Sequence, residues 1–214
     1  PDTFWSFKHA LRFIRKRASF PPLGLLTVAG LLPRDWDLRL IDMNVQPLTR
    51  RDLEWADYAF VSAMVVQRSS THAVIDRCVE MGLPVVAGGP LFLGEWQDFP
   101  TVSHFMLGEG ELTVPQFAED LLQGTARRVY ESPEFPDIRL SPAPRWDLVN
   151  LKYYSSMSIQ YSRGCPFDCE FCNITAMLGR RPRCKTAEQV INELDGLYAA
   201  GWRGGVFFVD DNLI

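Results

Sequence analysis

Three cysteines stand close together in the segment CPFDCEFC, where Cys165, Cys169 and Cys172 have the spacing C-x3-C-x2-C. Thiolates on one short loop can face a single cubane, and closely spaced Cys is how proteins ligate iron–sulfur clusters. Three thiolates bind only three of the four irons of a [4Fe–4S] cluster. An open coordination position distinguishes metal sites that do chemistry from closed structural ones. The spacing therefore predicts a [4Fe–4S] cluster with one free iron.

Two other interpretations of the same cysteines compete with the cluster. In the first, zinc would take Cys184 as its fourth ligand, although zinc prefers paired C-x2-C or Cys/His knuckles and only one such pair is present. In the second, the three cysteines bind nothing, which their density directly after a strand-like segment argues against. Cys78 lies in an amphipathic segment and is expected to be a small core residue.

The pattern C-x3-C-x-Φ-C, with Phe171 as the aromatic residue, resembles the signature of the radical S-adenosylmethionine superfamily. The approach SIQYSRGCPFDCEFC, which starts at Ser158, resembles the first barrel strand and cluster loop of its cobalamin-associated branch, near the hopanoid methylases. The resemblance implies that the amino and carboxylate groups of S-adenosylmethionine chelate the free iron. It also implies that the cofactor is cleaved to a 5′-deoxyadenosyl radical, with Phe171 against the adenine.

The resemblance also assigns a role to the end of the second barrel strand. In the family a Gly-Gly-Glu-like motif there holds the methionyl amino group, whereas this chain has Asp210, Asp211 and Asn212. Carboxylates can still accept hydrogen bonds from an ammonium group, so these three residues are expected to bind S-adenosylmethionine. Three arginines after the cluster loop would either meet the carboxylate of the cofactor or simply be solvated: Arg180, Arg181 and Arg183.

The elements that must position these residues follow a strand–helix–strand order. Short, continuously apolar runs are typical of strands covered on both faces, and repeated alternation with helical spacing indicates a doubly wound parallel α/β sheet. The predicted strands are Leu38–Ile41, Tyr58–Val66, Val85–Ala87 and His104–Leu107, and the predicted helices are Leu23–Leu32, Ser69–Met81 and Glu111–Leu122.

A second α/β pattern follows a proline-rich stretch that is predicted to be a linker, residues 131–155. Its predicted elements are strand Ser158–Tyr161, helix Ala187–Ala200 with a Thr186/Gln189 capping box, and strand Val206–Val209. The predicted domains are thus a cobalamin-binding-like Rossmann domain at 1–130, with its first strand expected before Pro1, and the N-terminal part of a radical S-adenosylmethionine barrel at 156–214. The chain is interpreted as a fragment of a longer protein.

The first domain resembles the cobalamin-binding domain of the same enzyme branch. PPLGLL from Pro21, Ser-x-Met at Ser62–Met64 and Gly88–Gly89 resemble recurrent elements of that fold, with Met64 a departure. Ligands of doubly wound sheets bind at the carboxyl ends of the strands. The Asp-x-His-x-x-Gly motif that supplies an axial His elsewhere is absent, and no cobalt ligand is predicted. The expected cobalamin-binding residues are Asn44, Ser62, Met64, Gly88, Gly89 and Glu109.

Composition limits the remaining possibilities. A formal net charge of -4 with mixed signs gives no reason to expect nucleic acid as a partner. No apolar stretch reaches the roughly 20 residues of a membrane span, and few, odd, clustered cysteines favour the reducing cytoplasm.

Taken with these limits, the resemblance implies a cobalamin-dependent methyltransferase that acts on an unactivated carbon of a small molecule, either lipid-like or a natural product, with flavodoxin or ferredoxin as electron donor. The alternatives are another radical reaction, such as methylthiolation or rearrangement, with the first domain as scaffold, or a non-enzymatic zinc-binding module.

Overall fold

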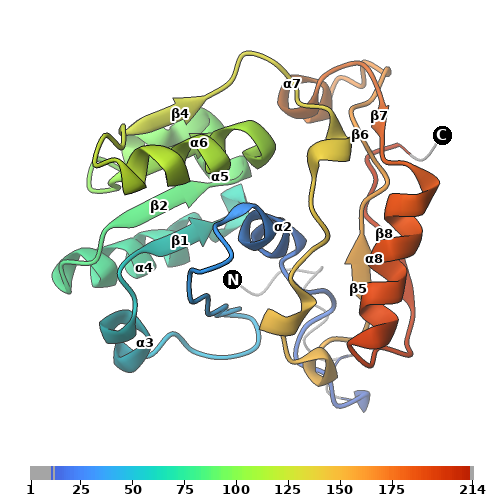
Figure 1. The fold of residues 1–214 in the computed structure, drawn as a ribbon, viewed down its shortest axis with the longest axis horizontal. Helices are drawn as coiled ribbons and strands as arrows, with labels where there is room; N and C mark the ends of the chain where they lie inside the picture. The colour runs from blue at the N-terminus through green and yellow to red at the C-terminus, as the bar shows by residue number, and fades with distance from the viewer. Residues whose placement is uncertain (1–10, 12, 213–214) are drawn as a thin grey trace. The chain divides into compact units, whose positions relative to one another are not determined.

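The computed structural model describes residue 11 and residues 13–212, and it divides the chain into two compact units (Figure 1). The first unit consists of Leu48–Phe135. The second unit combines the described residues up to Pro47 with those from Pro136 onward. The division differs from the predicted boundaries at 130 and 155, because the N-terminal segment packs with the C-terminal one.

The first unit is built on a parallel sheet with the strand order β1-β2-β3-β4. Its strands are β1 (Ala59–Ser62), β2 (Val85–Gly88), β3 (His104–Leu107) and β4 (Val129–Glu131). Its helices are α3 (Arg50–Trp55), α4 (Arg68–Glu80), α5 (Pro90–Glu95) and α6 (Gly110–Leu122), with short 3-10 helices η2 (Val65–Gln67) and η3 (Trp96–Asp98).

Helices cover both faces of this sheet (Figure 1). On one face, the ring of Phe117 in α6 meets Phe60 edge-on with a centroid distance of 6.0 Å. On the other face, Phe92 of α5 lies 6.0 Å from Phe105 of the third strand. Successive side chains of a strand point to opposite faces of the sheet, so the apolar residues of these strands pack against helices on both faces. The prediction of a doubly wound sheet is confirmed.

Two of the strands predicted for the first domain differ from the observed structure by more than one residue. Residues 38–41 form no strand, and Leu40 instead packs against the core of the second unit. The strand predicted at Tyr58–Val66 ends at Ser62, because the chain turns into η2 and the backbone N–H of Met64 donates to Oε1 of Gln67 at 2.9 Å. An apolar run alone does not reveal where strand pairing stops.

The second unit contains a parallel β-α-β arrangement in which β5 pairs with β8 and α8 lies between them in sequence. A separate two-stranded antiparallel ribbon is formed by β6 and β7. The elements are α2 (Leu23–Leu31), η4 (Ile138–Leu140), η5 (Trp146–Leu148), η6 (Leu151–Tyr153), β5 (Met157–Ile159), β6 (Ser162–Arg163), α7 (Ile174–Leu178), β7 (Arg183–Cys184), α8 (Ala187–Ala199) and β8 (Val206–Phe208).

Most of the predicted linker, from Pro136 on, belongs to the second unit and contributes to its core. Ile138, Trp146 and Tyr154 are buried, and the last two pack with Leu26 of α2 and Met157 of β5. The prolines of this stretch interrupt regular structure, and Phe135 and Leu140 between them are exposed, but Ile138 between them and Trp146 and Tyr154 after them are buried. From residue 136 on, the stretch is therefore packed structure.

The strand β8 ends the described part of the β-α-β arrangement and is more exposed than its apolar sequence suggests. Phe207 is 54% exposed, and its ring lies 5.5 Å from that of Phe20. None of the helices among the described residues is long and apolar enough to cross a bilayer.

Candidate functional site

The three cysteines of the predicted cluster follow β6 directly. Gly164 has φ +92°, and a Cβ there would lie 2.6 Å from the backbone oxygen of Arg181, so the chain enters the loop through a passage that only glycine fits. The backbone N–H of Cys165 donates to the carbonyl of Gly179 at 3.1 Å, and that of Cys172 donates to the carbonyl of Cys169 at 2.9 Å. The first hydrogen bond thus fixes the loop at Cys165, and the second closes a turn between Cys169 and Cys172.

All three thiols are free, with Cys165 half-buried and Cys169 and Cys172 exposed. Within residue 11 and residues 13–212, no three His, Cys, Asp or Glu side chains converge as a metal site. The donor set nevertheless suits an iron–sulfur cluster, because three soft ligands lie on one loop, two of them are exposed, and none is in a disulfide. Phe171 is 94% exposed beside them.

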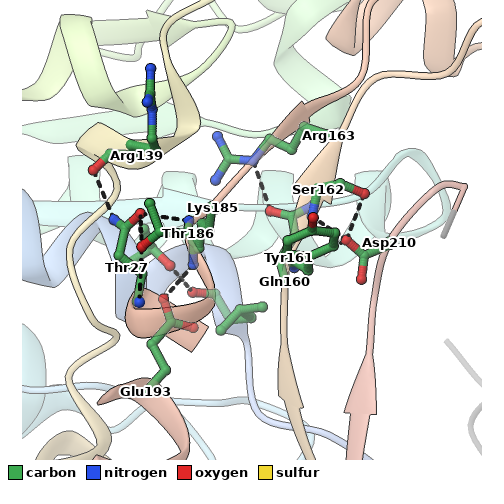
Figure 2. Close-up of polar contacts among 12 residues, drawn as sticks. Thr27, Arg139, Gln160, Tyr161, Ser162, Arg163, Lys185, Thr186, Glu193 and Asp210 are labelled. Carbon is green, nitrogen blue, oxygen red and sulfur yellow. Dashed lines mark hydrogen bonds and ion pairs between the residues drawn. The ribbon is translucent and has the colours of Figure 1, made fainter. Parts of the chain in front are cut away.

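Asp210 connects the end of β8 to the start of β6 (Figure 2). Its Oδ1 accepts hydrogen bonds from the backbone N–H of Tyr161 at 3.0 Å, from the backbone N–H of Ser162, and from Oγ of Ser162 at 2.9 Å. Its Oδ2 is buried and has no hydrogen-bond partner among the described residues. One oxygen is therefore used within the fold, while the other keeps its acceptor capacity.

The other residues predicted at this end differ in their surroundings. The backbone oxygen of Asn212 accepts from Oγ of Ser162 at 3.4 Å, and Asp211 is exposed. The guanidinium of Arg183 donates to the carbonyls of Pro136 at 2.5 Å and Leu178 at 2.8 Å, which is a structural role rather than solvation.

The remaining arginines and Cys184 flank the loop. Arg180 forms an exposed ion pair with Asp168 of the loop at 2.7 Å, and the Arg181 carbonyl faces Gly164. Cys184 lies on β7, where its hydrogen bond and charge raise the pKa of Tyr161.

A buried pair of charges near the loop was not predicted. Lys185 and Glu193 form an ion pair in which both side chains are almost wholly buried (Figure 2). The available signal was a carboxylate at an inward position of an amphipathic helix, where an apolar residue is expected. Spacing alone does not identify its partner.

At the carboxyl edge of the first unit's sheet, the structure brings together several residues predicted to bind cobalamin. Gly89 has φ +91°, and a Cβ there would lie 2.7 Å from Oγ of Ser62. Gly88 pairs with Ser62 across the strands, and Met64 is exposed just beyond β1. Glu109 precedes the first residue of α6. These residues form a glycine-lined, partly apolar edge.

Asn44 belongs to the second unit and is not part of this sheet edge. Its backbone N–H and its Nδ2 both donate to Oδ1 of Asp42 at 2.9 Å. Oδ2 of the same carboxylate accepts from the buried hydroxyl of Tyr154 at 3.0 Å. Asn44 therefore shapes a turn within the second unit.

Comparisons with known proteins agree with these observations. The chain is 43% identical over 216 residues to an uncharacterized methyltransferase of Synechocystis sp., covering 100% of this chain and 40% of that protein. It is 38% identical over 217 residues to the hopanoid C-2 methylase of Rhodopseudomonas palustris, covering 99% of this chain and 41% of the methylase. No family model matches the chain.

The fold is similar to that of a solved radical enzyme. The cobalamin-dependent S-adenosylmethionine radical enzyme OxsB, solved with aqua-cobalamin and S-adenosylmethionine bound, superposes with a TM-score of 0.74 at 19% identity, over 95% of this chain and 33% of that one. The chain thus spans about two fifths of the relatives that it matches by sequence. It is a homologue of the hopanoid methylases and has the fold of the cobalamin-dependent radical S-adenosylmethionine enzymes.

Proposed function

We propose that the protein containing this chain is a radical S-adenosylmethionine enzyme that methylates an unactivated carbon with the help of cobalamin. In this proposal Cys165, Cys169 and Cys172 bind a [4Fe–4S] cluster. The observation that carries it is the set of three free thiols on one loop, fixed at Gly164 and Cys165, in a chain 38% identical to a hopanoid methylase.

When bound, the cluster and S-adenosylmethionine supply a 5′-deoxyadenosyl radical, and cobalamin supplies a methyl group. The residues of this chain would bind and orient these groups. The exposed ring of Phe171 is available to cover an adenine. The unpartnered Oδ2 of Asp210 can accept a hydrogen bond from an ammonium group, because a buried carboxylate oxygen without a donor is costly. Asp211 and Asn212 would line the same strand end.

The sheet edge of the first unit is the proposed contact surface for cobalamin. Glycines at 88 and 89 let a bulky ligand approach the backbone, and Ser62 and Glu109 supply polar groups beside them. The exposed apolar side chain of Met64 suits the face of a macrocycle. Asn44 of the second unit is also proposed to contribute, although its Nδ2 donates to Oδ1 of Asp42.

The substrate and the electron source follow from the same proposal. The proposed substrate is a small molecule of the hopanoid type, as in the name of the relative from Rhodopseudomonas palustris. A one-electron donor such as flavodoxin or ferredoxin would reduce the cluster. The reducing cytoplasm is the proposed compartment, because free thiols must stay reduced to bind iron.

Replacement of single cysteines by serine tests the cluster. We expect the reconstituted wild-type protein to hold about four irons per chain. Each of Cys165→Ser, Cys169→Ser and Cys172→Ser should lose most of the iron and all cleavage of S-adenosylmethionine, whereas Cys184→Ser should retain both. Unchanged iron content in the first three variants, or stoichiometric zinc in the wild type, would refute the proposal.

Substitution at Gly89 tests the cobalamin surface. Gly89→Leu places a side chain where φ is +91° and Oγ of Ser62 is 2.7 Å away, so the sheet edge must deform. We expect at least a tenfold loss of cobalamin retained through gel filtration. Gly94→Leu, in α5 with nothing within 4 Å, is the matched control. If both variants retained equal amounts of cobalamin, this sheet edge would be excluded as the cobalamin-binding surface.

A further inference from the structure

The buried pair Lys185–Glu193 joins the end of β7 to α8. Nζ of Lys185 donates to Oε1 of Glu193, and the two side chains are only 5% and 3% exposed. Oε2 of Glu193 has no hydrogen-bond partner among the described residues. Burying two charges costs desolvation free energy that their attraction often fails to exceed, so such a pair is poor evidence of added stability. An ion pair is, however, directional, so the Lys185–Glu193 pair can fix the position of one element against another.

Lys185 also holds the ribbon that leads into the cluster loop. Its backbone N–H donates to the carbonyl of Tyr161 at 2.9 Å, just before β6. The ribbon itself pairs only Ser162 with Cys184 and Arg163 with Arg183. Two strands of two residues are marginal on their own, so their register depends on contacts outside the ladder.

Two cations act on the carboxyl group of Glu193, one on β6 and one directly after β7. Burial raises the pKa of its carboxyl, and the charges of Lys185, beyond β7, and Arg163, on β6, oppose that rise. Arg163 also donates from Nε to Oε1 of Gln160 at 2.7 Å. The carboxylate of Glu193, on a helix of 13 residues, is thus ion-paired with the residue that directly follows β7.

We infer that Lys185 and Glu193 are a positioning pair for the cluster loop, which fix the register of the β6–β7 ribbon against α8 and thereby the place of Cys165. A one-residue slip would turn every side chain of a strand to its other face. It would also break the Tyr161–Lys185 bond and the ion pair together. An apolar contact, being non-directional, would tolerate the slip. This inference rests on the proposed cluster.

The test compares single and double replacements in the full-length protein containing this chain. Lys185→Met and Glu193→Leu each leave a buried group unpaired and should lower the melting temperature. The double variant replaces the pair by apolar side chains, which often preserves folding. We expect it to melt like the wild type but to lose iron to a chelator about tenfold faster, as for other groups that act behind metal ligands.

A spectroscopic readout separates positioning from general stability. The EPR signal of the reduced cluster should change in the double variant, both alone and with S-adenosylmethionine added. A double variant with wild-type iron loss and wild-type EPR overturns the inference. A wild-type protein that binds no iron overturns the proposed function instead.

A second comparison does not depend on the folding of the double variant. Glu193→Gln removes the charge but keeps the shape, and Asp195→Asn makes the same change at an exposed position of α8. We expect faster iron loss only in Glu193→Gln. Equal rates in the two amide variants contradict the positioning role.

Discussion

The hydroxyl of Tyr154 shows how one residue can hold distant parts of the second unit. It donates to Oδ2 of Asp42 at 3.0 Å across 112 positions of sequence. Tyr154 is only 2% exposed. Burial raises the pKa of the Tyr154 hydroxyl above its ordinary value of 10.0, and the negative charge of Asp42 and the hydrogen bond to it add to the rise. The native contact thus requires the protonated phenol.

This contact predicts a loss of stability at alkaline pH. Because the folded pKa is raised, the unfolded chain releases the proton first, and the stabilisation is complete below pH 10.0 and declines as pH rises above it. Tyr154→Phe should cost about 1.5–3 kcal/mol at pH 8, the loss of a hydrogen bond to a charged group. Urea unfolding between pH 8 and 11 should show a smaller alkaline decline in Tyr154→Phe. Parallel curves for variant and wild type would contradict this assignment.

Elements with strong local signals were predictable. The capping box of Thr186 and Gln189 begins α8, and Gly201 follows its end with φ +95°. The helix α2 stops before Pro33, as the missing N–H of proline requires. Of the strands, β3 agrees with its prediction residue for residue. In each case the signal lies within a few residues of the boundary that it specifies.

Elements defined by their partners were not predictable. The β6–β7 ribbon exists because Ser162 meets Cys184, and nothing local marks either residue as a strand. Conversely, residues 38–41 have a strand pattern but no strand partner within the described part of the chain. The candidate site divides in the same way. The three cysteines were found by spacing, and their role stays a prediction, whereas the contacts of Asp210 and the Lys185–Glu193 pair come from long-range packing.

At the scale of the whole molecule, the first unit is inserted in sequence into the second. The backbone N–H of Arg17 donates to the carbonyl of Tyr153 at 2.8 Å, and that of Arg145 donates to the carbonyl of Leu26 at 3.1 Å. A Cβ on Gly30 would lie 2.8 Å from a side-chain carbon of Pro142. The residues that lead to the cysteine loop therefore depend on a segment more than 100 positions earlier.

This dependence predicts that residues 136–214 do not fold alone. Without residues 1–47 they lose Ala18 and the wholly buried Leu26 from their core. Burial of one leucine contributes about 1.5–3 kcal/mol, a large part of the stability of a small unit. The isolated polypeptide of residues 136–214 should show narrow amide chemical-shift dispersion in NMR spectra. Adding a peptide of residues 1–47 should restore the dispersion and shield Trp146 from solvent, as measured by its fluorescence. Residues 48–135, which keep their own sheet and core, should fold without either segment. Native-like spectra from residues 136–214 alone would contradict this prediction, because the core would then form without the N-terminal segment.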